Sequence, residues 1–78
     1  MPASELREAL RAIVAEVAEI DEVPDDAPFK DLGIDSMMAI EIVAEVERTY
    51  KIKVPEGELE QVRDLNSVVA LVEAKLPK

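Results

Sequence analysis

One hydroxyl group stands out in the stretch FKDLGIDSMMAIEIV, which runs from Phe29 to Val43. Ser36 follows an acidic turn and begins a strongly apolar helical pattern, a position where serine often serves only as the helix cap. A phosphate on that hydroxyl would also be favoured, because free backbone N–H groups and the helix dipole attract an anion there. Asp35 would repel the phosphate, so recognition by an enzyme with a basic surface explains its carboxylate better. Local sequence favours the cap and leaves attachment open.

The other residues offer little catalytic chemistry. The chain has no histidine and no cysteine, which excludes a Ser-His-Asp arrangement, a thiol nucleophile, a disulfide and a thiolate metal site. A Ser–Lys pair would have to join Ser36 to Lys30, and the spacing does not support one. The acidic segments do not match the calcium-loop pattern, so no metal site is predicted. With no catalytic residues identified, we expect that the protein is not an enzyme.

The size and charge of the chain limit its function further. Its 78 residues are enough for one small domain, 1–78, with an aliphatic core, since Phe29 and Tyr50 are the only aromatic residues. Apolar residues make up 49% and charged residues 35%, as in a globular protein. The net charge of −9 predicts that the protein does not bind nucleic acid, and it favours partners with basic patches.

Nothing in the sequence predicts insertion into a membrane. The first residues lack a basic-then-apolar signal pattern, and the longest apolar run, Val68 to Val72, is far too short to span a bilayer. The absence of cysteine suits a reducing compartment. We therefore expect a cytoplasmic, monomeric protein.

Helical periodicity predicts a first helix that begins after a cap at Ser4. Its apolar stripe runs from Leu6 to Val17, and Ile20 could extend it. A long acidic loop over residues 21–35 follows, in which prolines interrupt any helical pattern. A loop of this length in so small a domain is often functional.

The end of this loop should be fixed by its apolar residues. Phe29 and Leu32 are expected to turn inward and hold the loop against the core. Gly33 would allow a backbone conformation that other residues resist.

Two further helical patterns and one short turn complete the fold. The second helix should run from about Ser36 to about Tyr50, followed by extended residues 51–54 and a short helical turn over 56–61. The last helix should begin after a cap at Asp64 and end at Pro77. The sum is an all-α fold, a small four-helix bundle of three main helices and a short third helix, with the long loop between helices 1 and 2.

The second helix carries two apolar faces where an ordinary surface helix needs one. At 100° per residue, a core face is formed by Ala39, Ile42, Val43, Val46 and Tyr50. A separate flank contains Met37, Ile40 and Ala44, bordered by Glu41, Glu47 and Arg48. From the pattern alone, packing of the flank beneath the loop or against the short helix is the simpler interpretation. The alternative is a docking strip ringed by carboxylates for a basic partner.

The residues around Ser36 also resemble a known motif, F-x-D-L-G-x-D-S-[LM]. It is formed here by Phe29, Asp31, Leu32, Gly33, Asp35, Ser36 and Met37. This resembles the attachment motif of acyl carrier proteins, the phosphopantetheine-binding carriers. The resemblance covers nearly the whole chain, from the first helix through the acidic loop and the sequence YKIKVP to the last amphipathic helix.

The resemblance implies that a phosphopantetheinyl transferase moves 4′-phosphopantetheine from coenzyme A onto Ser36. The thiol of this arm would carry acyl groups as thioesters in fatty acid, polyketide or related lipid biosynthesis. Enzymes with basic docking patches would load, condense or tailor those groups. The positions that match the family's docking surface are Asp35, Met37, Ile40, Glu41, Ala44 and Glu47. The resemblance therefore favours docking as the role of the flank, and the family can shelter an acyl chain between its helices.

Some residues depart from the pattern of fatty acid carriers. Met37 replaces the usual leucine, Met38 stands where a polar residue is frequent, and Ala44 is smaller than the usual residue. The spacing of Phe29 from the Asp-Leu-Gly sequence is more like that of polyketide-type carriers. A polyketide-type or otherwise specialised free-standing carrier fits at least as well as a housekeeping one.

Two alternatives remain open. One is an aminoacyl or peptidyl carrier, although such carriers are usually less acidic and often have G-G-[HD]-S where this chain has G-I-D-S. The other is an acidic helical adaptor without an arm, in which Ser36 is only a cap.

Overall fold

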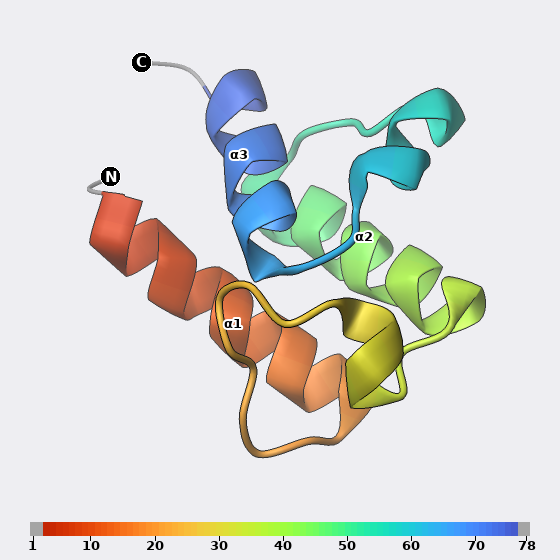
Figure 1. The fold of residues 1–78 in the computed structure, drawn as a ribbon. Helices are drawn as coiled ribbons and strands as arrows, with labels where there is room; N and C mark the ends of the chain where they lie inside the picture. Colours follow the sequence, from red (N-terminus) through yellow and green to blue (C-terminus); the bar gives the residue numbers. More distant parts are fainter. Residues whose placement is uncertain (1–2, 77–78) are drawn as a thin grey trace.

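Within residues 3–76, three amphipathic helices and two short 3-10 helices make up the fold (Figure 1). The computed structural model describes residues 3–76. The elements in chain order are α1 (Ala3–Ala18), η1 (Phe29–Leu32), α2 (Ser36–Tyr50), η2 (Glu56–Gln61) and α3 (Leu65–Lys75). The predicted bundle of three main helices and a short third helix is confirmed, and the third helix has the predicted bounds.

The core lies where α1 meets the other two long helices. Helix α1 packs against both α2 and α3. Its buried residues recur at intervals of about one helical turn, as an amphipathic helix requires. The largest fully buried side chains are Leu6, Leu10, Val14, Ile42, Leu65, Val69 and Val72. The core is aliphatic apart from Phe29, which is 4% exposed, in agreement with the prediction from composition.

The ends of α1 differ from the prediction. The helix begins at Ala3, so Ser4 lies in its first turn and the predicted cap at Ser4 is wrong. The helix ends at Ala18 because Glu19 takes a left-handed conformation with φ of 56°, which breaks the helical path. Ile20 therefore does not extend the helix, although it packs against the core.

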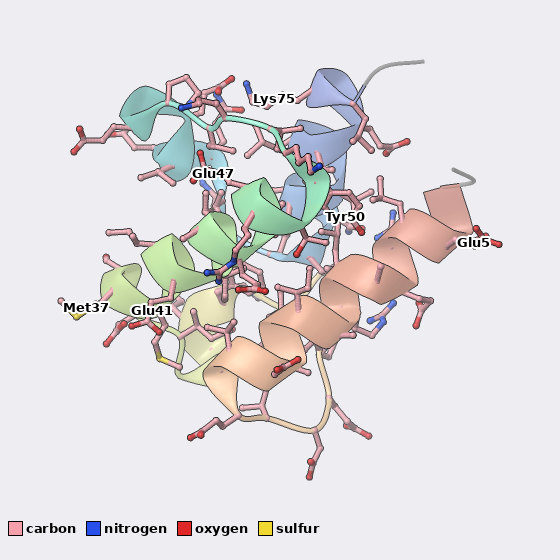
Figure 2. The ribbon with its side chains drawn as sticks, turned by 180° about the vertical axis from the view of Figure 1, so that it is seen from behind. Glu5, Met37, Glu41, Glu47, Tyr50 and Lys75 are labelled. Carbon is pink, nitrogen blue, oxygen red and sulfur yellow. The ribbon has the colours of Figure 1, made fainter. Side chains whose placement is uncertain are left out.

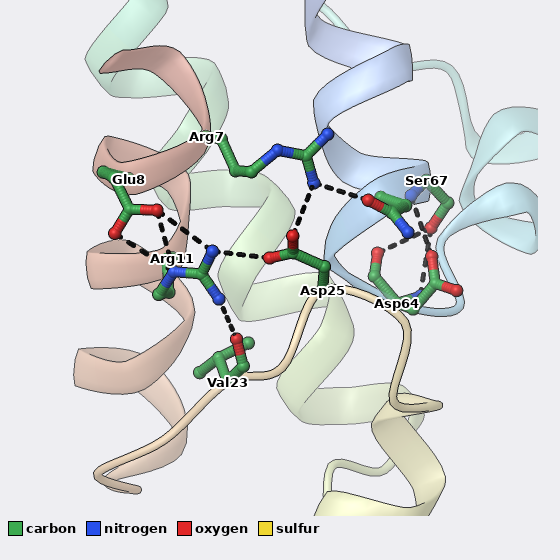
Figure 3. A network of polar contacts seen from close by, with 8 residues as sticks. Arg7, Glu8, Arg11, Val23, Asp25, Asp64 and Ser67 are labelled. Atoms are coloured by element: carbon green, nitrogen blue, oxygen red, sulfur yellow. Dashed lines mark hydrogen bonds and ion pairs between the residues drawn. The ribbon is translucent and has the colours of Figure 1, made fainter. Parts of the chain in front are cut away.

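The long loop is tied to α1 and α3 by polar contacts (Figure 3). Arg11 Nη2 lies 2.5 Å from Asp25 Oδ1, and Arg11 also donates to the carbonyl of Val23. The pKa of the Arg11 guanidinium is raised, chiefly by its hydrogen bonds to Glu8 and then by those to Asp25. The backbone N–H of Asn66 donates to the carbonyl of Asp25 at 3.0 Å. The loop therefore passes along α1 and reaches the start of α3. These contacts fix the position of η1, the short helix near the end of the loop.

The turn between α2 and η2 is also held by side chains. Lys51 ends α2 in a left-handed conformation with φ of 56°, so the prediction of extended backbone is wrong at this residue. Farther on, Glu47 Oε2 accepts a hydrogen bond from the backbone N–H of Val54 at 2.9 Å. Lys75 Nζ pairs with Glu58 Oε2 at 2.8 Å and joins the end of α3 to η2. These contacts position an element that has no buried residue of its own.

Helix α3 begins as predicted. The carboxylate of Asp64 accepts from the backbone N–H of Ser67 at 2.8 Å, and Ser67 Oγ accepts from the backbone N–H of Asp64, which completes a capping box. Leu76 follows the helix and packs against the core, while the predicted terminator Pro77 lies outside the described residues. Within residues 3–76, no helix is long and apolar enough to cross a membrane.

Candidate functional site

Asp35, and not Ser36, caps α2. Asp35 has extended backbone with φ of −90° and ψ of −178°, and its Oδ1 accepts a hydrogen bond from the backbone N–H of Met38 at 2.8 Å. Ser36 is the first residue of the helix. The interpretation of Ser36 as the helix cap is therefore wrong, because the residue before it already occupies the capping position. The carboxylate that seemed unfavourable to an anion has a structural role.

The Ser36 side chain is exposed and available for chemistry. Within the described part of the chain, no hydrogen bond involves its hydroxyl. Ser67 differs, since its Oγ accepts from the backbone N–H of Arg63 at 2.9 Å and donates to the carbonyl of Asp64 at 2.7 Å. Ser4 is exposed but lies on a different element, in the first turn of α1. Ser36 is thus an exposed hydroxyl at the N-terminus of a long helix, without a local structural task.

A short structured segment positions Ser36. Phe29 in η1 and Ile34 after it are 4% and 5% exposed, so both side chains anchor this segment in the core. Between them, Gly33 takes a left-handed conformation with φ of 79°, and its N–H donates to the carbonyl of Lys30 at 3.3 Å. The N–H of Ile34 donates to the carbonyl of Phe29 at 2.9 Å. The predicted inward positions of Phe29 and Leu32 and the special backbone of Gly33 are confirmed.

An open groove of about 740 Å³ is lined in part by Ser36. It lies between η1, the first turns of α2, and the segment from η2 to α3. Its apolar lining is formed by Pro28, Phe29, Ile34, Ala39, Ile40, Leu59 and Val62. An elongated group attached to Ser36 Oγ would have this apolar surface beside it. Leu59 and Val62 were not predicted as site residues, and their signal was the presence of apolar residues in the otherwise polar segment EGELEQV.

The N-terminal half of α2 also presents an apolar flank to solvent. Met37 is 72% and Ile40 is 54% exposed, and they are the large hydrophobic residues that the described chain leaves exposed. Ala44 and Glu41 are exposed on the same helix. Figure 2 shows Met37 projecting outward from the start of α2. Packing of Met37 and Ile40 beneath the loop or against the short helix, the simpler interpretation of the pattern, is therefore wrong, because both side chains are mostly exposed.

Glu47 combines an outer position with an internal contact. The residue is half-buried toward the end of α2 (Figure 2), and its Oε2 accepts from the N–H of Val54. The carboxylate thus helps to hold the turn after α2, a role that the sequence analysis missed because the bond joins residues seven positions apart. Glu41, by contrast, makes no side-chain hydrogen bond or ion pair with another described residue. Of Glu41 and Glu47, only Glu41 has a carboxylate without a polar contact to another described residue.

The chemistry that this arrangement supports is attachment and presentation. In residues 3–76, no group of three or more acidic or histidine side chains is arranged to hold a metal ion. The exposed hydroxyl lies between an apolar groove on one side and the flank of Met37 and Ile40 on the other, and Ile40 borders both. Such a site can carry a covalently attached group and offer it to another protein.

The sequence of this chain is similar to those of known carrier proteins. Residues 8–72 match the family described as phosphopantetheine attachment site. The anthracycline acyl carrier protein DpsG of Streptomyces peucetius is 44% identical over 78 residues, which cover 94% of this chain and 88% of that protein. The polyketide-8 synthase acyl carrier protein 2 of Streptomyces avermitilis is 41% identical over 73 residues, covering 90% and 84%. The acyl carrier protein of Helicobacter hepaticus is 34% identical over 70 residues, covering 86% and 92%.

A solved structure shares the fold. The crystal structure of an acyl carrier protein from Thermotoga maritima superimposes with a TM-score of 0.78 at 25% identity. The match covers 90% of this chain and 89% of that one.

Proposed function

This chain belongs to the phosphopantetheine attachment family of acyl carrier proteins, and on that premise we propose that Ser36 Oγ bears its 4′-phosphopantetheine group. The protein is a carrier of acyl groups in polyketide or fatty acid biosynthesis and not an enzyme. The observation that supports Ser36 is the division of roles at the start of α2. Asp35 caps the helix, which leaves the Ser36 hydroxyl exposed and free of hydrogen bonds within residues 3–76.

The residues at this site fit the prosthetic group. Its phosphate would lie at the N-terminus of α2, where backbone N–H groups and the helix dipole favour an anion. The apolar lining of the groove, which includes Leu59 and Val62, suits an elongated chain extending from Ser36. When attached, the group supplies a terminal thiol that holds an acyl group as a thioester.

Attachment requires a partner enzyme, because no described side chain is hydrogen-bonded to the Ser36 hydroxyl as a base would be. We propose that a phosphopantetheinyl transferase supplies one. In this transfer Ser36 Oγ forms a bond to the phosphorus that carries pantetheine in coenzyme A. The pyrophosphate bond breaks, adenosine 3′,5′-bisphosphate leaves, and the hydroxyl proton passes to a base of the transferase. The carrier contributes an accessible, well-positioned hydroxyl.

The flank of α2 is the proposed docking face for the transferase and for the enzymes that load, condense or tailor the acyl group. Met37, Ile40 and Ala44 supply exposed apolar contacts. The carboxylates of this proposed face are those of Asp35, Glu41 and Glu47. In a chain with a net charge of −9, such a surface favours partners with basic patches.

The named relatives favour this function over the alternatives. They are acyl carrier proteins, two of them linked by name to anthracycline or polyketide synthesis, which agrees with the prediction of a polyketide-type carrier. No observation separately supports an aminoacyl carrier or an unmodified adaptor.

The proposal is tested by intact mass after incubation of the unmodified protein with coenzyme A, Mg²⁺ and a broad-specificity transferase. The wild type should gain the mass of one phosphopantetheine, and Ser36→Ala should gain none. Ser4→Ala is the matched control, because it removes another exposed serine hydroxyl, and it should be modified like the wild type. Modification of Ser36→Ala, or no modification of a folded wild type with several transferases, would overturn the proposal.

A further inference from the structure

Two cations line the groove that contains Ser36, although the protein is strongly acidic. The chain has 9 basic residues against 18 acidic ones. Ion pairs between described residues involve Arg7, Arg11, Arg48 and Lys75. Lys30 and Arg63, both exposed and both lining the groove, make no ion pair with another residue in 3–76. Unpaired positive charge therefore lies beside the proposed attachment point.

Backbone hydrogen bonds bring these two residues to the same part of the groove. The N–H of Phe29 donates to the carbonyl of Arg63 at 2.7 Å, which joins η1 to the segment before α3. The carbonyl of Phe29 accepts from Ile34, and the carbonyl of Lys30 accepts from Gly33. Lys30 thus lies in the tight turn that leads into Ser36, and Arg63 lies directly beside that turn.

The carboxylates that line the groove differ in how far they offset the positive charges of Lys30 and Arg63. Asp35 and Asp64 cap α2 and α3, and each accepts a hydrogen bond from a backbone N–H of its own helix. Their negative charges therefore face the positive ends of the two helix dipoles, which offset them in part. Glu60 is the remaining carboxylate in the lining, and it is exposed. The positive charges of Lys30 and Arg63 therefore favour an anion on their side of the groove.

We propose that Lys30 and Arg63 are positioning residues that hold the arm along the groove by binding the phosphodiester that links it to Ser36. This inference rests on the proposed function. The phosphodiester would be tethered within this groove, so its effective concentration there is high. Guanidinium groups bind phosphate oxygens in a bidentate manner, and ammonium groups bind them as point charges. Retention would keep the arm over the apolar lining until a partner enzyme draws it out.

The test compares amide chemical shifts of the protein before and after attachment of the arm, using ¹⁵N-labelled chain with a free thiol. Attachment to the wild type should shift the amide signals of groove residues such as Ala39, Leu59 and Val62. In Lys30→Gln/Arg63→Gln, the shifts at Leu59 and Val62 should fall at least about twofold, as expected when two exposed charge contacts are lost. Added salt should reduce the wild-type shifts toward the variant's values.

A matched control keeps the overall charge change the same. Lys51→Gln/Lys53→Gln also removes two exposed positive charges, and neither residue lines the groove. It should retain the wild-type shifts. Equal shifts at Leu59 and Val62 in the wild type and both variants would overturn the proposal, as would equal losses in both variants. The proposal would also be overturned if the substitutions changed the amide shifts only after a malonyl group is loaded on the thiol. In that case the cations would bind the malonyl carboxylate and not the phosphodiester.

Intact mass separates this proposal from the assignment of Ser36. All three proteins should accept one phosphopantetheine, because Lys30 and Arg63 make no described side-chain contact that holds the fold. If the arm is attached to all of them and the shifts do not differ, only the positioning role fails. If the folded wild type accepts no arm, the proposed function fails instead.

Discussion

Two adjacent residues at the start of α2 have separate roles, since Asp35 caps the helix and Ser36 is the proposed attachment point. Asp35 Oδ1 accepts the hydrogen bond from Met38, and Ser36 begins the helix with an exposed side chain. Both residue types are good helix caps, so the sequence alone could not assign the cap to one of them. The extended backbone of Asp35 decides it, since a capping residue lies outside helical geometry.

This division predicts unequal effects on stability for substitutions at the two neighbouring residues. Asp35→Ala should lower the free energy of unfolding by about 1 kcal/mol, because it removes a capping side chain. Ser36→Ala should change it by less than about 0.5 kcal/mol, as for an exposed position away from such features. Urea unfolding followed by circular dichroism measures both values, and Asp35→Asn should retain most of the wild-type stability. A larger loss in Ser36→Ala than in Asp35→Ala would contradict the assignment of the cap.

The turn before Ser36 depends on one glycine. Gly33 has φ of 79°, and a Cβ added there would meet nothing within 4 Å, so the cost of a side chain comes from the backbone alone. Gly33→Ala should therefore lower the free energy of unfolding by about 1 kcal/mol. Gly57→Ala is the control, because its site is equally open and its φ is not left-handed. Equal effects of the two substitutions on urea unfolding would show that the left-handed turn is not the cause.

At the scale of elements, α2 serves the core with one face and the proposed partners with another. Ile42, Val43 and Val46 are buried, as the periodicity predicted, while Ala39 and Tyr50, which lie toward the two ends of the helix, are only half-buried. The periodicity identified two faces but could not determine which neighbour would cover the second one. That depends on the path of the loop and of η2, which long-range contacts set.

The proposed docking face predicts a kinetic effect that is confined to α2. Glu41→Lys should raise the transferase KM several-fold and leave kcat nearly unchanged, because it places a cation where a basic partner patch should bind. Glu73→Lys makes the same charge reversal at an exposed site on α3 and should have a much smaller effect. Steady-state kinetics of arm attachment measures both. Equal changes in KM would indicate that net charge alone matters and would exclude a local docking face.

The last residue of α2 predicts a pH dependence. Desolvation raises the pKa of the half-buried Tyr50 phenol, so the folded state favours its neutral form. Its contribution to stability is full below the unfolded-state pKa of about 10 and is lost as pH rises through the folded-state value. Urea unfolding between pH 9 and 11 should therefore show a steeper loss of stability in the wild type than in Tyr50→Phe. Parallel pH profiles would contradict this assignment.

At the scale of the whole molecule, the bundle could be predicted because its signals are local. Helical periodicity, prolines and the cap at Asp64 specify where most elements lie. The contacts that place the elements join residues far apart in sequence, such as Arg11 with Asp25 and Phe29 with Arg63. No local sequence pattern indicates which residues form such long-range pairs. The same limit applies to the groove, whose lining comes from two segments, 28–40 and 59–64, that are not adjacent in the sequence.

The proposed attachment of the arm to Ser36 is tested most directly by locating the added group on the chain. The wild type would be converted by the transferase, digested, and its peptides fragmented by mass spectrometry. The described chain offers other hydroxyl side chains at Ser4, Thr49, Tyr50 and Ser67. We expect the entire added mass on Ser36. Phosphopantetheine on any other residue, with Ser36 unmodified, would contradict the account.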